Sequence, residues 1–176
     1  MGDYYCIFDM DGTLFFTDEL NNESYNTALI KNSLTSIESS YKRITREVVK
    51  FLHPKISVQV LLEVIRQKQE YFVKNIGKVQ TNIFLFDMLR KLEKHKCALW
   101  TSAEKSRAEA IIKEFNLESF FCTKIFSSKK HIPEDIKYIC SELAGTKEQL
   151  LVFENDASVV KELQKNNVSC FLLIRP

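Results

Sequence analysis

Residues 4–14 read YYCIFDMDGTL, an apolar run of five residues that stops at the acidic residue Asp9. A short run that is apolar on both faces is typical of a strand buried inside a parallel sheet. In open parallel sheets, ligands bind outside the carboxyl ends of the strands. The residues just past this run, Asp9 and Asp11, are therefore the first candidates for a functional site.

Four other short runs are rich in apolar, aromatic and β-branched residues, and they lie at 97–100, 122–126, 150–153 and 170–174. The stretches between the runs have helical character, and they lie at 82–94, 104–115, 133–143 and 157–166. The alternation of strands with helices predicts an α/β fold, a doubly wound parallel sheet with right-handed crossovers.

Residues 16–80 break this alternation. No buried strand is expected between Leu14 and residue 97, and helices are predicted instead at 18–33, 45–52 and 57–75. We therefore predict two domains, which are an α/β core of residues 1–15 and 81–176 and a small helical domain of residues 16–80.

Composition and charge exclude several classes of protein. The chain has 176 residues, of which 45% are hydrophobic and 27% charged, and this is ordinary for a globular protein. Its net charge of +2 gives no basic excess for nucleic acid or a membrane surface. No apolar run is long enough to span a membrane, and no segment resembles a signal peptide. We expect a soluble cytoplasmic protein, a monomer or weak dimer, with no nucleic-acid or membrane partner.

Asp9 and Asp11 are expected to share one site, because residues two apart in an extended chain point the same way. Two carboxylates in a partly dry cleft repel each other, and a divalent ion with a preference for oxygen ligands, such as Mg²⁺, relieves the repulsion. The following residues, Gly12 and Thr13, allow a sharp turn that aims backbone N–H groups at an anion.

This stretch resembles the first motif of the haloacid dehalogenase superfamily, in which a hydrophobic strand precedes Asp-x-Asp-Gly-Thr and Leu or Val. The resemblance extends over essentially the whole chain and implies a Rossmann-like core that transfers phosphoryl groups. It implies that Asp9 attacks phosphorus to form an aspartyl-phosphate, while Asp11 protonates the leaving group and then activates water. The alternative is an acidic surface turn that follows a strand.

The second motif of the superfamily is a Thr or Ser at the end of the second core strand. Thr101 matches it, and Ser102 follows as a second candidate phosphate ligand. The alternative for both residues is that they cap the helix expected to begin at Glu104.

The third motif is a Lys that holds the nucleophile and the phosphoryl group in one electrostatic frame. The family pattern Lys-Pro-x-Pro-Asp, counted back from Pro133, selects Lys130 as the catalytic and phosphate-binding lysine. Lys129 is its competitor.

The sequence departs from the family at the fourth motif, where an Asp usually binds the metal. Asn155 takes the usual Asp position, between Glu154 and Asp156. An Asn carbonyl can bind Mg²⁺ but adds no negative charge, so we expect Glu154 or Asp156 to supply the missing carboxylate. The alternative is an acidic loop that caps the next helix.

The helical insert resembles the cap of phosphoglycolate phosphatase and β-phosphoglucomutase relatives, which closes over the phosphate and selects the leaving group. By this resemblance, His53 and Lys55 are candidate specificity residues. The alternative is that they are ordinary loop residues.

The resemblance thus implies a Mg²⁺-dependent phosphatase that acts on a small phosphorylated metabolite. A phosphomutase of the same superfamily would carry the same motifs. Because of Asn155, a catalytically impaired binding or regulatory protein is a further alternative.

Overall fold

The computed structural model describes residues 4–38 and 40–174. The chain divides into two compact units, one formed by Met1–Phe16 with Thr81–Pro176 and the other by Thr17–Gln80. Each unit has its own core, and each is described by itself.

The first unit is built on a parallel sheet of five strands in the order β5-β4-β1-β6-β7. The strands are β1 Tyr5–Phe8, β4 Cys97–Thr101, β5 Thr123–Phe126, β6 Leu150–Glu154 and β7 Ser169–Leu172. The central strand β1 pairs with β4 and β6, so that Phe8 lies between Leu99 and Phe153. The predicted doubly wound parallel sheet is confirmed, with strand ends within two residues of those expected.

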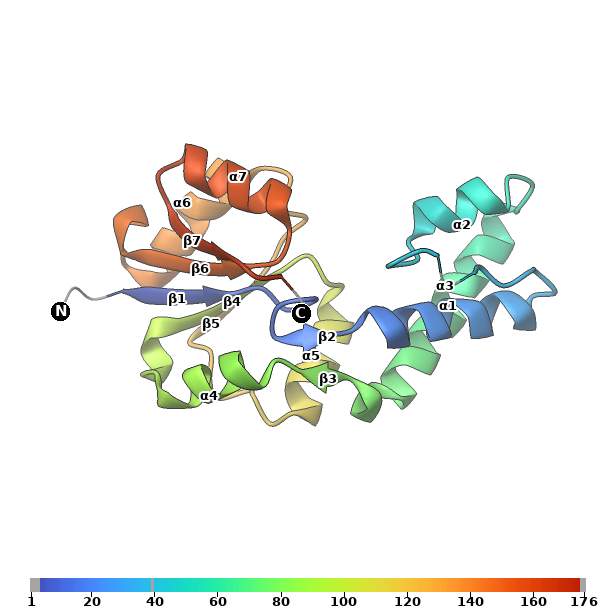
Figure 1. Cartoon of the computed structure of the whole chain (residues 1–176), viewed down its shortest axis with the longest axis horizontal. Helices are drawn as coiled ribbons and strands as arrows, with labels where there is room; N and C mark the ends of the chain where they lie inside the picture. Colours follow the sequence, from blue (N-terminus) through green and yellow to red (C-terminus); the bar gives the residue numbers. More distant parts are fainter. Residues whose placement is uncertain (1–3, 39, 175–176) are drawn as a thin grey trace. The chain divides into compact units, whose positions relative to one another are not determined.

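Helices cover both faces of the sheet, α6 and α7 on one side and α4 and α5 on the other (Figure 1). Their bounds are α4 Ile83–Lys91, α5 Lys105–Glu114, α6 Ile132–Leu143 and α7 Ala157–Lys165. The core on the first side joins Ile7 and Trp100 of the sheet to Ile136 and Leu163 of the helices. Burial of these side chains fixes the face of each strand, because a shift of one residue would turn them outward.

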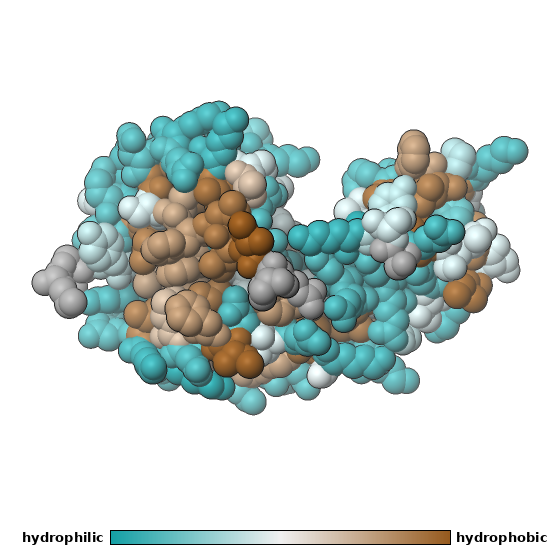
Figure 2. Space-filling model, viewed as in Figure 1, coloured by the Kyte–Doolittle hydropathy of each residue, from teal (hydrophilic) through white to brown (hydrophobic). Residues whose placement is uncertain are grey.

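The opposite face of the sheet carries a row of stacked rings. Phe8 stacks on Phe153 with ring centroids 5.0 Å apart, and Phe153 stacks on Phe171 at 5.3 Å. Phe171 is 52% exposed, and Figure 2 shows apolar residues gathered over β6 and β7. The stacking thus continues from the buried centre of the sheet to its exposed edge.

Short elements were not expected from the sequence. Strands β2 Phe15–Phe16 and β3 Gln80–Thr81 form a two-stranded sheet where the chain leaves the core and returns to it. Single turns of 3₁₀ helix lie at Ile76–Lys78, Lys94–Lys96 and Lys147–Gln149. Elements of two or three residues are too short to show a hydrophobic period, and for this reason the sequence could not reveal them.

The second unit consists of three helices, α1 Asp18–Lys31, α2 Arg46–Leu52 and α3 Val58–Lys74, all close to their predicted bounds. Leu29, Val49 and Val64 are fully buried in its core. The side chains of Thr45 and Ser57 cap α2 and α3 by accepting from backbone N–H groups. Among the described residues, no helix is both long and apolar enough to cross a membrane.

Candidate active site

The candidate site lies at the carboxyl ends of the parallel strands of the first unit. Asp9 follows β1, Thr101 ends β4, Glu154 ends β6, and the loop after β5 carries Lys129. The backbone N–H of Asp9 donates to the carbonyl of Phe153 at 2.9 Å, which extends the β1–β6 pairing to the first site residue.

Asp9 is a buried carboxylate, only 4% exposed. Its Oδ1 accepts a hydrogen bond of 2.6 Å from Lys129 Nζ. Burial raises the pKa of Asp9, Lys129 lowers it, the nearby Glu154 and Asp11 carboxylates raise it, and the net result is a pKa of about 7. That the Asp9 and Asp11 carboxylates share one site stays a prediction.

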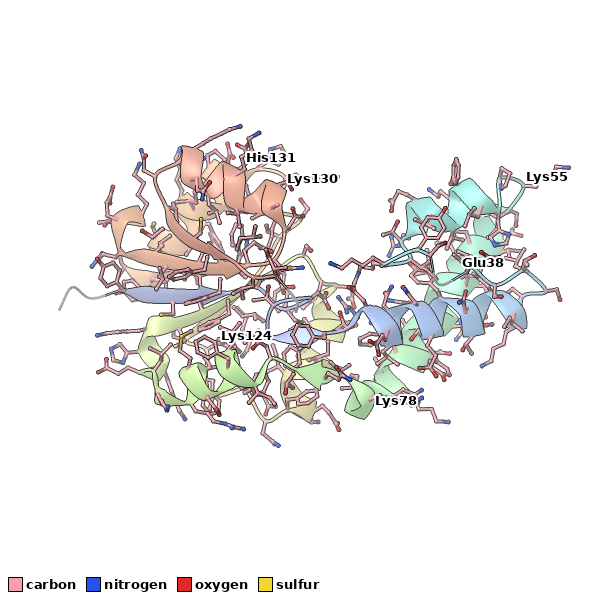
Figure 3. All side chains as sticks on the ribbon, in the orientation of Figure 1. Glu38, Lys55, Lys78, Lys124, Lys130 and His131 are labelled. Atoms are coloured by element: carbon pink, nitrogen blue, oxygen red, sulfur yellow. The ribbon has the colours of Figure 1, made fainter. Side chains whose placement is uncertain are left out.

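Lys129, and not Lys130, is the lysine beside Asp9, which corrects the choice made from the sequence. Lys129 Nζ lies 2.6 Å from Asp9 Oδ1 and 2.6 Å from Glu154 Oε2, and its side chain is 6% exposed. Lys130 is exposed, near the start of α6 (Figure 3). Burial alone would lower the pKa of Lys129, but the carboxylates of Asp9 and Glu154 raise it, so the amine stays charged.

A local network explains why counting back from the proline failed. Lys129 has a left-handed backbone (φ 55°), which turns its side chain inward from the loop. Ser127 Oγ accepts from Lys129 N at 3.0 Å and from Trp100 Nε1 at 3.3 Å, and it donates to Asp135 Oδ2 at 2.5 Å. The ammonium lies 4.8 Å from the centroid of the Trp100 ring. No sequence signal pointed to Ser127 or Asp135 as supports of the lysine.

Asp11 forms a buried ion pair that the sequence analysis missed. Arg107 of α5 donates from Nη1 to Asp11 Oδ1 at 3.0 Å, and from Nη2 to Oδ2. Arg107 is only 5% exposed and lies beside Ala108 and Ile111, which are fully buried. A signal was present, because an arginine on the apolar face of a helix needs a partner.

Gly12 and Thr13 form the turn after Asp11, with Gly12 at φ 82°. A Cβ at Gly12 would lie 2.3 Å from Asn155 Nδ2. The close approach of the Asn155 side chain therefore requires glycine at position 12. The N–H of Gly12 donates to Phe15 O at 2.7 Å, and that of Thr13 donates to Met10 O at 3.4 Å. The expectation that these N–H groups are aimed at an anion is therefore wrong, since both close the turn.

Thr101 is 1% exposed, and its Oγ1 accepts from Ala103 N at 3.1 Å. Ser102 is exposed. Neither residue caps α5, because Glu104 accepts from the N–H groups of Ser106 and Arg107, both at 3.1 Å. The capping alternative for Thr101 and Ser102 is thus wrong, and their roles toward phosphate stay predictions.

The last residue of β6 and the two residues after it have different environments. Glu154 is buried, and its Oε1 accepts from Asn155 N and Asp156 N at 2.9 Å each. Asp156 is exposed and caps α7, because its Oδ1 accepts from Ser158 N at 2.8 Å. The structure brings Glu154 and Asn155 next to Asp9 and Asp11, and engages Asp156 in the helix cap.

The oxygen atoms around Asn155 are of the kind that magnesium prefers as ligands. In one orientation of the amide its oxygen faces other acceptors, and in the other its nitrogen donates to Asp11 O at 3.0 Å and Glu154 Oε1 at 3.2 Å. Oxygens that face one another repel unless a donor or a cation lies among them. Within residues 4–38 and 40–174, no three His, Cys, Asp or Glu side chains form a metal cluster. The oxygen ligands of such an ion would be the Asp9 carboxylate, the Asp11 carbonyl and the Asn155 amide oxygen.

The two candidate specificity residues belong to the helical unit. His53 follows α2. Its Nε2 atom is buried and has no hydrogen-bond partner among the described residues. Lys55 lies on an exposed turn (Figure 3). A role in substrate choice stays a prediction for both.

Comparison with known proteins places this chain in a family. The family model described as haloacid dehalogenase-like hydrolase matches residues 6–172. No curated protein matches the sequence.

Solved structures similar to this chain include a predicted phosphoglycolate phosphatase from Haemophilus somnus, with a TM-score of 0.83 and 16% identity over 97% of this chain and 85% of that one. A protein from Thermotoga maritima classed as a β-phosphoglucomutase has a TM-score of 0.78 and 20% identity over 98% and 86%. CbbY from Rhodobacter sphaeroides, solved with phosphate, has a TM-score of 0.73 and 17% identity over 98% and 86%.

Proposed function

Because the chain belongs to the haloacid dehalogenase-like hydrolase family, we propose that it is a Mg²⁺-dependent phosphatase of a small phosphorylated metabolite. The observation that carries the proposal is the buried Asp9 carboxylate held by Lys129 at 2.6 Å. A buried carboxylate fixed by one cation is suited to in-line attack, since its position is set before substrate binds.

In the proposed reaction, a carboxylate oxygen of Asp9 attacks phosphorus and the bond from phosphorus to the ester oxygen breaks. Asp11 gives a proton to the departing oxygen, so that an alcohol leaves and an aspartyl-phosphate remains. Asp11 then takes a proton from water, which attacks the same phosphorus and releases inorganic phosphate. Asp9 returns to its starting carboxylate form.

The chain's cations and polar groups would stabilise the charge that develops on the phosphoryl oxygens. Lys129 lies beside Asp9 and would supply positive charge. Thr101, at the end of β4, would supply a hydroxyl group. Ser102 is a further phosphate ligand in this proposal. We propose that the helical unit serves as the cap, with His53 and Lys55 selecting the leaving group.

Mg²⁺ would be held by the Asp9 carboxylate, the Asp11 carbonyl and the Asn155 amide oxygen, with Glu154 next to them. When bound, it would supply charge neutralisation and polarise the phosphoryl group. The ion pairs of the site support this, because Asp9 and Glu154 share the single ammonium group of Lys129.

Asp9→Asn tests the proposal most directly. The substitution keeps the shape of the side chain and removes the nucleophile, so turnover of p-nitrophenyl phosphate in Mg²⁺ should fall by several orders of magnitude. Asp87→Asn, at a carboxylate of α4 whose side chain is 57% exposed, is the matched control and should keep full activity. Full activity in Asp9→Asn would refute the assignment.

A phosphomutase is the second candidate, favoured by the similarity in fold to the protein classed as a β-phosphoglucomutase. The two functions differ in the acceptor of the phosphoryl group, which is water in one and a sugar hydroxyl in the other. Priming with a sugar bisphosphate and following isomerisation of the monophosphate separates them. Release of inorganic phosphate without isomerisation supports the phosphatase.

A further inference from the structure

The ion pair between Arg107 and Asp11 joins two elements of the core that are far apart in sequence. The guanidinium donates from two nitrogens to two oxygens of one carboxylate, with Nη1 at 3.0 Å from Oδ1. The side chains are 6% and 17% exposed. This two-pronged arrangement fixes the plane of the carboxylate as well as its position.

Arg107 is itself held in place from several sides. Its backbone N–H donates to Glu104 Oε2 at 3.1 Å in the cap of α5. On the same helix face, Ala108 and Ile111 are fully buried. A cation in such surroundings costs free energy unless it is paired, so the guanidinium is kept at the carboxylate.

The pairing has a consequence for the direction in which the Asp11 carboxyl group points. The guanidinium holds both carboxylate oxygens. Rotation of the carboxyl group is therefore limited by the fork of the guanidinium.

We propose that Arg107 is a positioning residue that orients the Asp11 carboxyl group for proton transfer to the leaving oxygen. The inference rests on the proposed function, in which Asp11 is the general acid. In this role Arg107 acts through Asp11.

The test uses leaving groups of different acidity. p-Nitrophenolate departs from phosphorus with little help from an acid, whereas the less acidic phenol of phenyl phosphate needs a proton. Kinetics of this chain in Mg²⁺ are compared for wild type, Arg107→Lys and Arg107→Met on both substrates. Arg90→Met, at an arginine whose side chain is 63% exposed, is the matched control.

We expect kcat/KM, which reports departure of the leaving group, to fall about tenfold or more further on phenyl phosphate than on p-nitrophenyl phosphate. Arg107→Lys should show a smaller effect in the same direction, since it keeps the charge and loses the fork. In the Asp11→Asn background, Arg107→Lys should have no further substrate-dependent effect, because the proton donor is already gone.

Equal losses of kcat/KM on the two substrates, or no loss on either, would overturn the positioning role. Should Arg107→Met fail to fold, Arg107→Lys carries the test, because it keeps a cation beside the buried carboxylate. The proposed function fails separately, if wild type turns over neither substrate or Asp9→Asn keeps its activity. Wild-type activity that depends on Asp9, with an unchanged substrate ratio in the Arg107 variants, removes the positioning role alone.

Discussion

Two sets of ion pairs in this protein have the same chemistry and opposite surroundings. At the candidate site, Lys129 lies 2.6 Å from both Asp9 and Glu154, and all three side chains are at most 6% exposed. On α3 of the helical unit, Arg66 lies 2.5 Å from Glu63, with side chains 56% and 39% exposed. Distance alone therefore does not distinguish a pair in the site from a pair on the surface.

The carboxylates show the difference in surroundings. Burial raises the pKa of Asp9 to about 7 in spite of its lysine. Hydrogen bonds from Arg66 and Gln67 lower the pKa of Glu63 to about 2. Burial does not oppose this lowering as it does at Asp9, because Glu63 is exposed to solvent. The buried carboxylate of Asp9 is therefore available to bind a cation. The exposed carboxylate of Glu63 is already solvated by water.

Removal of the buried cation should have the largest effect. Lys129→Met leaves Asp9 and Glu154 as two neighbouring buried acids, so the free energy of unfolding at pH 8 should fall by about 3–5 kcal/mol. Activity on p-nitrophenyl phosphate should be lost as well. Denaturant unfolding and a turnover assay measure the two effects.

The control is Lys130→Met, at the exposed neighbour, which should keep both stability and activity. If Lys130→Met were inactive and Lys129→Met active, the lysine chosen by the geometry would be the wrong one.

Magnesium binding should weaken as the pH falls below the pKa of Asp9, which is about 7 without metal. A proton and a cation compete for the same carboxylate, and the folded protein releases the proton when the cation binds. The apparent affinity should therefore drop about tenfold for each pH unit below 7. Calorimetry between pH 5 and 8 measures this slope, and a flat profile would contradict the burial of an ionisable ligand.

Asn155 should set the strength of the metal site. Asn155→Asp adds the negative charge that family members usually have there, so the affinity for Mg²⁺ should increase about tenfold. Asn155→Ala should decrease it. If the wild-type protein binds Mg²⁺ only above millimolar concentration, and beryllofluoride is not trapped at Asp9, the impaired binding or regulatory protein becomes the better interpretation.

The sequence predicted the sheet because its buried strands are apolar on both faces and end in polar residues at the same edge. It also predicted that functional residues lie at the carboxyl ends of the strands, and so selected Asp9, Thr101 and Glu154 as candidates. It could not predict Lys129 over Lys130, since the choice depends on the left-handed backbone at Lys129 and on bonds to Ser127. Contacts between side chains that only the fold brings together leave no pattern in the local sequence.

Arg107 is an intermediate case between what the sequence shows and what only the fold shows. Its place on the apolar face of α5 indicated burial, but its partner Asp11 lies 96 positions earlier in the chain. Hydrophobic periodicity predicts that a residue is buried, and it does not identify the opposite charge that will meet it. The partner of a buried charge comes from the strand order, which brings β1 beside β4.

The exposed pair should give the smallest effect, and it completes the comparison. Arg66→Gln removes hydrogen bonds to Glu63 and Glu70 on α3. We expect no change in the midpoint of thermal unfolding beyond experimental error, because surface ion pairs in water lose in side-chain entropy and screening most of what they gain. Glu63→Gln, which removes the other partner, should behave in the same way.

A large loss of stability in either variant would show that exposure does not decide the value of a pair in this chain. The contrast with Lys129→Met would then have to come from the chemistry of the site instead of its burial. Measurement at low and at high salt separates the two explanations, since salt screens an exposed pair and leaves a buried one nearly unchanged.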